Sequence, residues 1–502
     1  MKHQLRTLLL MSTLFSAGLA RANPVGEFED HGDIGAPTLP GAASYDVANQ
    51  AYTVAGAGTN MWFGADQCHF AWRKLKGDFI LRTRVEFLGP GVVAHRKGGW
   101  LVRPNLEPDA PYADAAEHGS GLTSLQFRRS KGAKTEEVSL AITNADLLQL
   151  ERRGTTFIFS AAHFGEPFVS GELTNLDLGP EVLAGLFLCS HSGEAVEQAM
   201  FRDVRMILPA APDFKPYQDY IGSVLEILEV QTGRLERIHA SAQPFEAPNW
   251  TVDDKSLIYN VSGRAAGAGQ LVRFDLASKQ TSSLETDPTL KCNNDHVLSF
   301  DGRMLGISAS HAGQSQIFTL PATGGTPKPI TTLAPSYLHG WSPDGQWLVF
   351  TGGRSGKFDI YMIPAAGGAE VRLTDAPGLN DGPEFSPDGQ FIYFNSSRTG
   401  KMQIWRMKPD GSGQEAVTND EFNNWFAHVS PDGKWLVFLS FGSDVKPDDH
   451  PYYKSVYLRL LPVAGGRAKV IAYVYGGQGT MNVPSWSPDS RRIAFVSNTR
   501  MP

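Results

Sequence analysis

A short motif that recurs six times in the second half of the chain constrains the fold more than any other feature. Its clearest copies read Ser-Pro-Asp-Gly, as at 342–345, and two weaker copies precede them. Each copy combines a tight turn with an apolar run typical of a β-strand. Repeats of roughly 40 to 50 residues indicate the blades of a β-propeller. The Ser or Thr residues that mark successive copies are Thr251, Ser299, Ser342, Ser386, Ser430 and Ser487.

Six copies predict six blades over residues 222–502, and the ends of this region predict how the ring closes. The last copy stops near residue 496, after only two strands. The apolar runs at 224–228 and 234–238 supply the missing outer strands. Pairing of N- and C-terminal strands in one blade would leave no open edge in the ring.

These repeats resemble those of TolB-type propellers, which are relatives of WD-type repeats. The resemblance covers residues 222–502 and is carried by the recurring Ser-Pro-Asp-Gly turns. It implies the propeller fold and one candidate function, a non-catalytic periplasmic scaffold that binds an envelope protein or peptide. Propellers host many activities, so the function has to be argued from the site.

Residues 1–22 have the pattern of a secretory signal peptide. A basic start precedes an apolar run at 8–19, and a small-x-small sequence follows it. The run is too short to span a bilayer, and no later stretch is suited to do so. We therefore expect a periplasmic or secreted protein without membrane insertion. The net charge of −7 argues against a nucleic-acid partner.

Residues 23–208 lack the repeat and predict a separate β domain, joined to the propeller by a short linker at 209–221. Residues 79–87 alternate apolar and polar side chains, as in a half-buried strand. This half resembles the concanavalin-like jelly-roll domains attached to carbohydrate-active proteins, so an all-β chain with a sandwich and a propeller is expected. It is left open whether Cys68 and Cys189 are bridged. For a sugar-binding surface the candidates are Trp62, Trp72, Trp100, Arg103, Tyr112 and His118, with core packing as the alternative for each Trp.

In a propeller, the loops that enter the inner strands converge around one end of the central channel. Polar residues recur in these loops, five residues before the repeated Ser or Thr, and histidines stand three residues before it in two units. We expect these side chains to bind a ligand, although they could instead cap loops and hold channel water. The recurring set is Glu246, Asn294, Tyr337, Asp381, Trp425 and Asn482, joined by His296, His339, Asn423, Asn424 and His428.

Two further features point to the same end of the propeller. The hairpins on this face carry basic residues, which suit recognition of carboxylates, although a turn preference for Arg explains them equally well. The fifth unit is longer than the others, and its extra residues lie within 441–453. Insertions in repeat arrays usually form loops on a functional face. The basic residues are Arg264, Arg354, Lys357, Arg398 and Lys401, and the insertion contributes His450, Tyr452 and Tyr453, followed by Lys454.

The propeller also resembles, more distantly, that of oligogalacturonate lyases. That family binds its metal with a Gln followed by two His. Here Gln478 matches, but Met481 and Val483 stand where the histidines would be. The sequence therefore does not predict whether the protein binds a metal cofactor. We hypothesise that the mouth binds an oligosaccharide or polysaccharide, with a uronate-containing one among the candidates, and that a lyase or hydrolase would use His339, His428, Tyr453 and Lys454 as catalytic groups.

Overall fold

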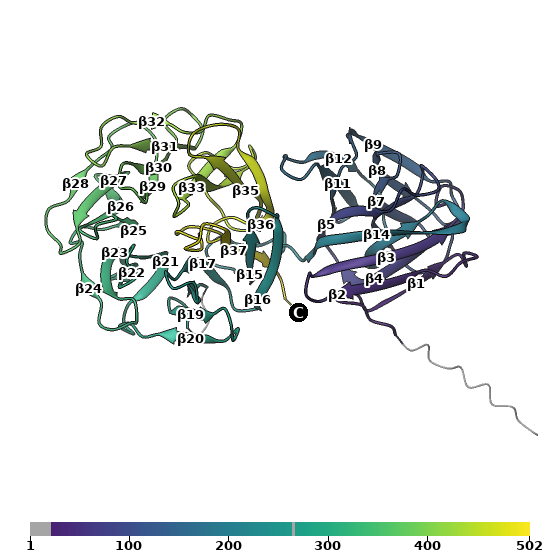
Figure 1. The fold of residues 1–502 in the computed structure, drawn as a ribbon, viewed down its shortest axis with the longest axis horizontal. Helices are drawn as coiled ribbons and strands as arrows, with labels where there is room; N and C mark the ends of the chain where they lie inside the picture. Colours follow the sequence, from purple (N-terminus) through teal and green to yellow (C-terminus); the bar gives the residue numbers. More distant parts are fainter. Residues whose placement is uncertain (1–21, 264–266, 502) are drawn as a thin grey trace, which may run out of the picture.

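The structure, a computed structural model, describes residues 22–263 and 267–501. These residues form 37 β-strands and no helix, arranged as a sandwich beside a ring of blades (Figure 1). The predicted all-β class, with a sandwich followed by a six-bladed propeller, is confirmed. The predicted signal peptide lies almost entirely outside the described residues. Within them, no helical segment has the length and apolarity needed to cross a membrane.

Two seven-stranded antiparallel sheets form the sandwich. The first has the order β1 (Asp30–Ile34), β4 (Cys68–Lys76), β13 (Glu181–Cys189), β6 (Lys97–Arg103), β7 (Tyr112–His118), β8 (Leu122–Arg128) and β9 (Glu136–Thr143). The second has the order β12 (Val169–Leu173), β11 (Thr156–Ala162), β10 (Leu147–Arg153), β5 (Phe79–Leu88), β14 (Ser192–Ile207), β3 (Ala51–Gly58) and β2 (Ala42–Asp46).

Alternating apolar residues of both sheets build the sandwich core. Phe79, Leu81 and Val85 of β5 are buried there together with Trp100 of β6. This packing accounts for most of the surface expected to bind sugar. Trp100, Arg103, Tyr112 and His118 are all buried, whereas Trp62 remains 37% exposed. Core packing, the alternative for each Trp, therefore holds for Trp100, whereas Trp62 and the half-buried Trp72 remain accessible.

Five blades of the propeller have four strands each. The first three are β17 (Phe245–Trp250), β18 (Ser256–Val261), β19 (Leu271–Asp275) and β20 (Thr281–Leu284); β21 (Lys291–Leu298), β22 (Met304–His311), β23 (Gln314–Pro321) and β24 (Lys328–Pro329); and β25 (Ser336–Trp341), β26 (Trp347–Arg354), β27 (Lys357–Pro364) and β28 (Val371–Arg372). The fourth and fifth are β29 (Asn380–Phe385), β30 (Ile392–Ser396), β31 (Gln403–Met407) and β32 (Glu415–Ala416); and β33 (Asn423–Val429), β34 (Trp435–Phe441), β35 (Lys454–Pro462) and β36 (Lys469–Gly476).

The sixth blade joins the two ends of the propeller, as predicted. Strand β37 (Arg492–Thr499) pairs with β15 (Gly222–Glu229), which pairs in turn with β16 (Arg234–Ser241). Leu225 lies opposite Val496 in this register, and both side chains are buried. The closing blade therefore contributes its own apolar core, and the ring has no unpaired inner edge.

The repeated motif forms the same local structure in every copy. Its Ser or Thr hydroxyl donates a hydrogen bond to the Asp two residues later, at 2.5 to 2.7 Å. Short polar side chains that bond nearby groups favour such turns. The motif therefore fixes the turn between the inner strand and the next strand of each blade, which explains its regular spacing.

Candidate functional site

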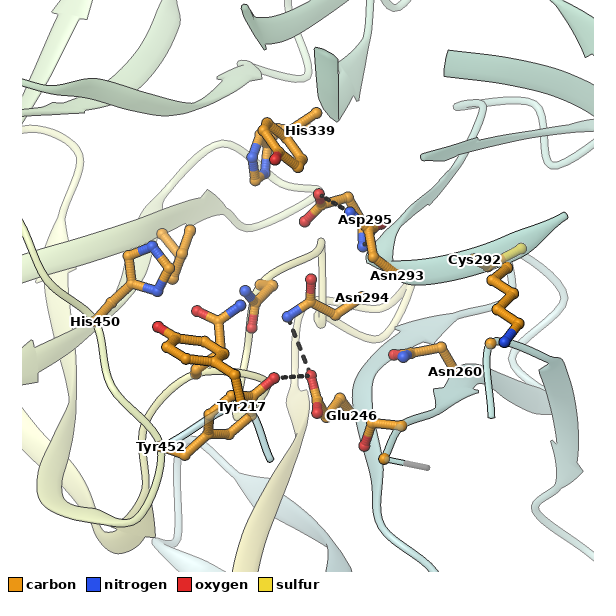
Figure 2. Close-up of a pocket in the computed structure, with 18 of the residues that line it drawn as sticks. Tyr217, Glu246, Asn260, Cys292, Asn293, Asn294, Asp295, His339, His450 and Tyr452 are labelled. Carbon is orange, nitrogen blue, oxygen red and sulfur yellow. Dashed lines mark hydrogen bonds between the residues drawn. The ribbon is translucent and has the colours of Figure 1, made fainter. Parts of the chain in front are cut away.

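A cavity of about 1110 Å³ occupies the end of the central channel at which the inner strands begin. Figure 2 shows the side chains around it. We refer to this cavity as the mouth pocket. Propeller loops, the insertion of the fifth blade and the linker all contribute to its wall. Nine of the candidates line it, namely Glu246, Asn294, Tyr337, His339, Asp381, His450, Tyr452, Gln478 and Asn482.

One side of the mouth pocket alternates carboxylates and imidazoles from successive blades. His339 Nε2 lies 3.5 Å from Asp381 Oδ1, and His450 Nε2 lies 4.0 Å from Asp381 Oδ2. Burial opposes protonation of His339, but the charges of Asp295 and Asp381 outweigh it, so the pKa of His339 is raised. Burial favours the neutral form of Asp381, yet the hydrogen bond and charge of His339 hold the pKa of Asp381 below its usual value. This side of the pocket therefore holds an ionised carboxylate next to a histidine that protonates readily.

Glu246 forms the opposite corner of the pocket. Its Oε2 accepts hydrogen bonds from Asn294 Nδ2 at 3.1 Å and from the Tyr452 hydroxyl at 3.4 Å (Figure 2). The side chain is 5% exposed, and this burial raises the pKa of Glu246 to about 7. Near neutral pH, the carboxyl can thus hold or release a proton.

The raised pKa of Glu246 predicts a change in the pH dependence of stability in Glu246→Gln. The protonated carboxyl stabilises the folded state below about pH 4.5, and this contribution is lost as the pH rises through about 7. Between pH 5 and 8, we expect the free energy of unfolding of the wild type to fall by about 2 kcal/mol relative to Glu246→Gln. Urea denaturation of both proteins across this range checks it, and parallel pH profiles would contradict it.

Aromatic residues of the linker and of the insertion form a wall of the mouth pocket. Tyr217 and Tyr220 of the linker meet Tyr452 edge to face, at ring distances of 5.6 and 5.7 Å. Next to them, the backbone N–H of Ile221 donates to the Tyr453 hydroxyl at 3.0 Å. The segment predicted to be a plain spacer is thus docked on the propeller and completes the pocket.

Several predicted residues lie outside the mouth pocket. His296 is fully buried. Its Nε2 lies 3.1 Å from the carbonyl of Ile258, so it connects the second blade to the first. His428 is buried and paired with Glu384 at 2.5 Å. Tyr453 packs on the linker, and Lys454 lies 3.7 Å from the exposed Asp444. Of the four candidate catalytic groups, the structure therefore places only His339 on the pocket wall.

The fifth blade also differs from the expected ring. Trp425 is fully buried and lies behind the wall, where it contacts His450, and Phe426 lines the pocket instead. Phe426 has a φ of 52°, at an irregularity in the pairing of β33 with β34. Asn423 donates to the carbonyl of Val445, and the Asn424 amide donates to Gln403 of the fourth blade. Asn423 therefore holds the insertion, and Asn424 joins the fifth blade to the fourth.

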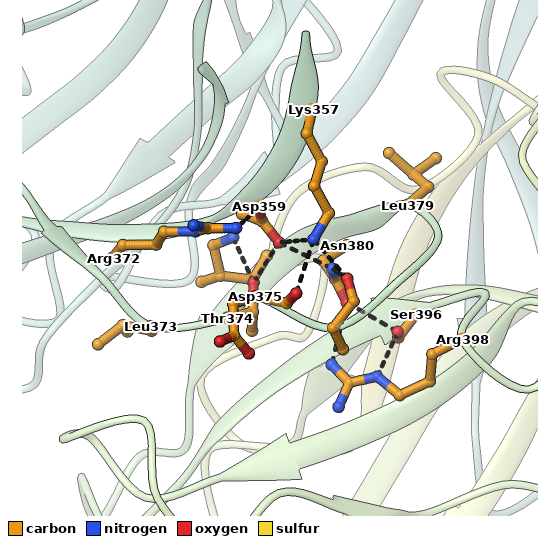
Figure 3. A network of polar contacts seen from close by, with 12 residues as sticks. Lys357, Asp359, Arg372, Leu373, Thr374, Asp375, Leu379, Asn380, Ser396 and Arg398 are labelled. Atoms are coloured by element: carbon orange, nitrogen blue, oxygen red, sulfur yellow. Dashed lines mark hydrogen bonds and ion pairs between the residues drawn. The ribbon is translucent and has the colours of Figure 1, made fainter. Parts of the chain in front are cut away.

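The predicted basic rim is not part of the mouth pocket. Arg354 pairs with Glu370 at 2.9 Å. Arg398 donates to Ser396 and to Asn380, within a polar network between the third and fourth blades that centres on the buried Asp359 (Figure 3). Lys357 and Lys401 donate to backbone carbonyls, and Arg264 lies outside the described residues. No described arginine lines the pocket, which contains Lys291 instead.

The structure also adds residues that the sequence reasoning missed. Asp295 directly follows the predicted Asn294, and Asn260 lies opposite Glu246 in the pairing of β17 with β18. The repeat period could not single out Asp295, because irregular pairing of the inner strand β21 changes which neighbour faces the channel. Asn260 was missed because it lies on the second strand of its blade, outside the entry loops. The other additions are Tyr217, Tyr220, Ser262, Lys291, Cys292, Asn293, Thr351, Phe358, Leu379, Phe426 and Asp448, together with glycines and apolar residues at 261, 263 and 267–269.

Only one of the three positions compared with the lyase metal site lies at the pocket. Gln478 lines the mouth pocket, but Met481 and Val483 are fully buried in apolar clusters. Across the described part of the chain, no group of three His, Cys, Asp or Glu side chains is arranged to hold a metal ion. All three cysteines are buried free thiols.

Comparison with known proteins places the propeller in a family. Residues 332–446 match the model of the TolB β-propeller domain. An uncharacterised protein of Agrobacterium fabrum is 44% identical over 276 residues, which cover 55% of this chain and 92% of that protein. A solved structure from Agrobacterium tumefaciens, described as a TolB candidate, is 43% identical with a TM-score of 0.53, covering 57% of this chain and all of that one.

A manganese complex of an oligogalacturonate lyase also matches, at 13% identity and a TM-score of 0.37 over 76% of this chain and 96% of that one. A match of this strength carries no argument about activity. The Agrobacterium relatives match a length close to that of the propeller alone. The chain therefore belongs to the TolB-like β-propeller family.

Proposed function

We propose that this protein is an exported, TolB-like binding protein whose mouth pocket takes a segment of an envelope protein. The proposal rests on the family, on the predicted signal peptide and on the chemistry of the pocket wall. A site of this volume is ample for several residues of an extended chain. In this proposal, the protein acts in the periplasm or outside the cell and binds its partner without cleaving it.

The amide side chains of the pocket are the observation that favours a peptide. Each carboxamide offers both donors and an acceptor, as does each unit of a peptide backbone. Five amides from three structural segments therefore provide for pairing with an extended chain, much as sheet edges do. They are Asn260, Asn293, Asn294, Gln478 and Asn482.

The charge of the pocket argues against an anionic glycan. Glu246, Asp295, Asp381 and Asp448 all line it, whereas Arg354 and Arg398 are held by other partners. A uronate would have to approach these carboxylates with little compensation from cationic groups. Like charges at close range are strongly unfavourable in a partly buried site.

Hydrolysis of a neutral oligosaccharide is a second candidate function. It is favoured by two carboxyl groups of the pocket whose pKa values are shifted in opposite directions. Burial raises the pKa of Glu246 to about 7, while the pKa of Asp381 is lowered despite its burial. A proton donor and an ionised partner are what glycoside hydrolysis requires. The tyrosines of the wall could stack against sugar rings.

A parallel screen tests the two functions. The purified protein is presented with a random heptapeptide display library and with a panel of neutral and uronic oligosaccharides. We expect the library to be enriched in peptides that bind the wild-type protein. The Tyr217→Ala variant should bind these peptides roughly fivefold more weakly, because Tyr217 is 55% exposed on the pocket wall.

The matched control is Phe300→Ala, since Phe300 is 43% exposed at the other end of the inner strands. We expect this variant to bind the selected peptides like the wild type. Turnover of a neutral oligosaccharide would favour the second function. An absence of peptide enrichment would refute the first.

A further inference from the structure

The Glu246 corner of the mouth pocket contains oxygen acceptors that lack donors. From this geometry we infer that the corner is a seat for a primary ammonium group, presented by a lysine side chain or by a chain N-terminus. The inference rests on the proposed function, because it specifies what the bound segment must carry. It concerns Glu246, Asn260 and Gln478, together with the tyrosine wall.

Two side chains next to Glu246 have buried oxygens without a hydrogen-bond partner, namely Asn260 Oδ1 and Gln478 Oε1. Asn260 lies opposite Glu246 in the strand register and is 2% exposed (Figure 2). Gln478 precedes Gly479, at which a Cβ atom would come within 2.4 Å of Glu246 Cγ. Glu246 and Asn260 therefore share one corner of the pocket wall, and Gln478 lines the pocket next to the residue that packs against Glu246.

These oxygens require a donor, and an ammonium supplies three. Amide and carboxylate oxygens only accept hydrogen bonds, and leaving buried acceptors unpaired costs roughly 1–3 kcal/mol each. An –NH₃⁺ group carries three N–H donors and no acceptor, so it can serve the carboxylate and both amides. A hydroxyl offers a single donor and would leave two of the three oxygens unserved.

The surroundings of the corner favour a cation. Tyr217, Tyr220 and Tyr452 border it, and aromatic rings next to carboxylates attract ammonium groups and pack against an alkyl stem. Among the described lining residues, Lys291 is the one Lys or Arg side chain. The carboxylates of the pocket outnumber it, so the local field favours positive charge.

Binding should strengthen as the pH rises through the titration of Glu246, because the ammonium requires the ionised carboxylate. Protonation of His339 at lower pH adds positive charge to the pocket and acts in the same direction. The titratable or charged groups that face the pocket are Tyr217, Tyr220, Glu246, Lys291, Cys292, Asp295, Tyr337, His339, Asp381, Asp448, His450 and Tyr452.

Four lysine derivatives test the inference on the full-length protein by isothermal titration calorimetry. The probes are lysine amide, its Nα-acetyl form, its Nε-acetyl form and the doubly acetylated form. We expect the doubly acetylated probe to bind at least about tenfold more weakly than lysine amide, because charge-assisted hydrogen bonds are lost. Between the two singly acetylated probes, the tighter one identifies a side-chain or a terminal amine as the source.

Glu246→Gln should weaken the best probe at least about tenfold and flatten its pH profile between pH 6 and 8. The control is Asp444→Asn, which removes one negative charge as Glu246→Gln does, but at a carboxylate of the insertion that is 70% exposed. Equal binding of all four probes, or binding of none, would overturn the inference. Peptides that are enriched in the display screen but do not need an amine would leave the proposed function standing while refuting the ammonium seat.

Discussion

Asp66→Ala should destabilise the sandwich domain by about 3–5 kcal/mol, the largest change in stability that we expect from one substitution. Asp66 is fully buried and accepts hydrogen bonds from both terminal nitrogens of Arg128, at 2.6 and 2.8 Å. Arg103 lies 3.5 Å away and is also fully buried. Removal of the carboxylate would leave two guanidinium groups in the protein interior without a counter-charge.

Urea denaturation followed by tryptophan fluorescence measures this effect, because Trp100 lies in the sandwich core. Asp109→Ala is the matched control. Asp109 pairs with Lys131 at 3.6 Å, but the lysine side chain is 66% exposed, so we expect a loss below about 1 kcal/mol. Equal effects of the two substitutions would show that the buried ion cluster does not hold the sandwich together.

The propeller could be predicted from the sequence because its signal is local and repeated. In each copy the Ser or Thr hydroxyl bonds the nearby Asp, so the motif specifies one turn independently of the rest of the chain. Six such turns, with strands between them, determine the number of blades. The closing pair, β15 and β37, could be inferred because one blade lacked strands.

The candidate site could be predicted only in part. The position five residues before the motif faces the channel in five blades, but in the fifth blade Phe426 replaces Trp425. His296 and His339 occupy equivalent sequence positions, yet only His339 lines the pocket. Side chains of this kind are oriented by irregular strand pairing and by neighbouring blades, which a single repeat does not encode.

Contacts between segments that are distant in the chain could not be predicted from the sequence. Tyr217 and Tyr220 lie in a segment whose composition suggests a spacer, and they reach the pocket because Tyr453 and its neighbours hold the linker. The buried cluster of Asp66, Arg103 and Arg128 has the same origin, since it joins a loop to two strands. Neither arrangement leaves a periodic signal.

The central claim is that the mouth pocket is where this protein binds its partner, and Asn293→Trp tests it by filling that cavity. Asn293 lines the pocket, and its amide bonds the Asp295 carboxylate at 3.0 Å. The larger ring would occupy the space of the ligand, so we expect affinity for the tightest selected heptapeptide to fall at least about a hundredfold. Asn419→Trp, on an exposed loop away from the mouth, is the control.

Calorimetric titration of that peptide into the wild type, Asn293→Trp and Asn419→Trp gives the most direct answer, with urea denaturation confirming that all three are folded. The structure predicts wild-type affinity for Asn419→Trp and loss of binding for Asn293→Trp. Undiminished affinity of a folded Asn293→Trp protein would place the binding site elsewhere on the molecule and contradict this assignment.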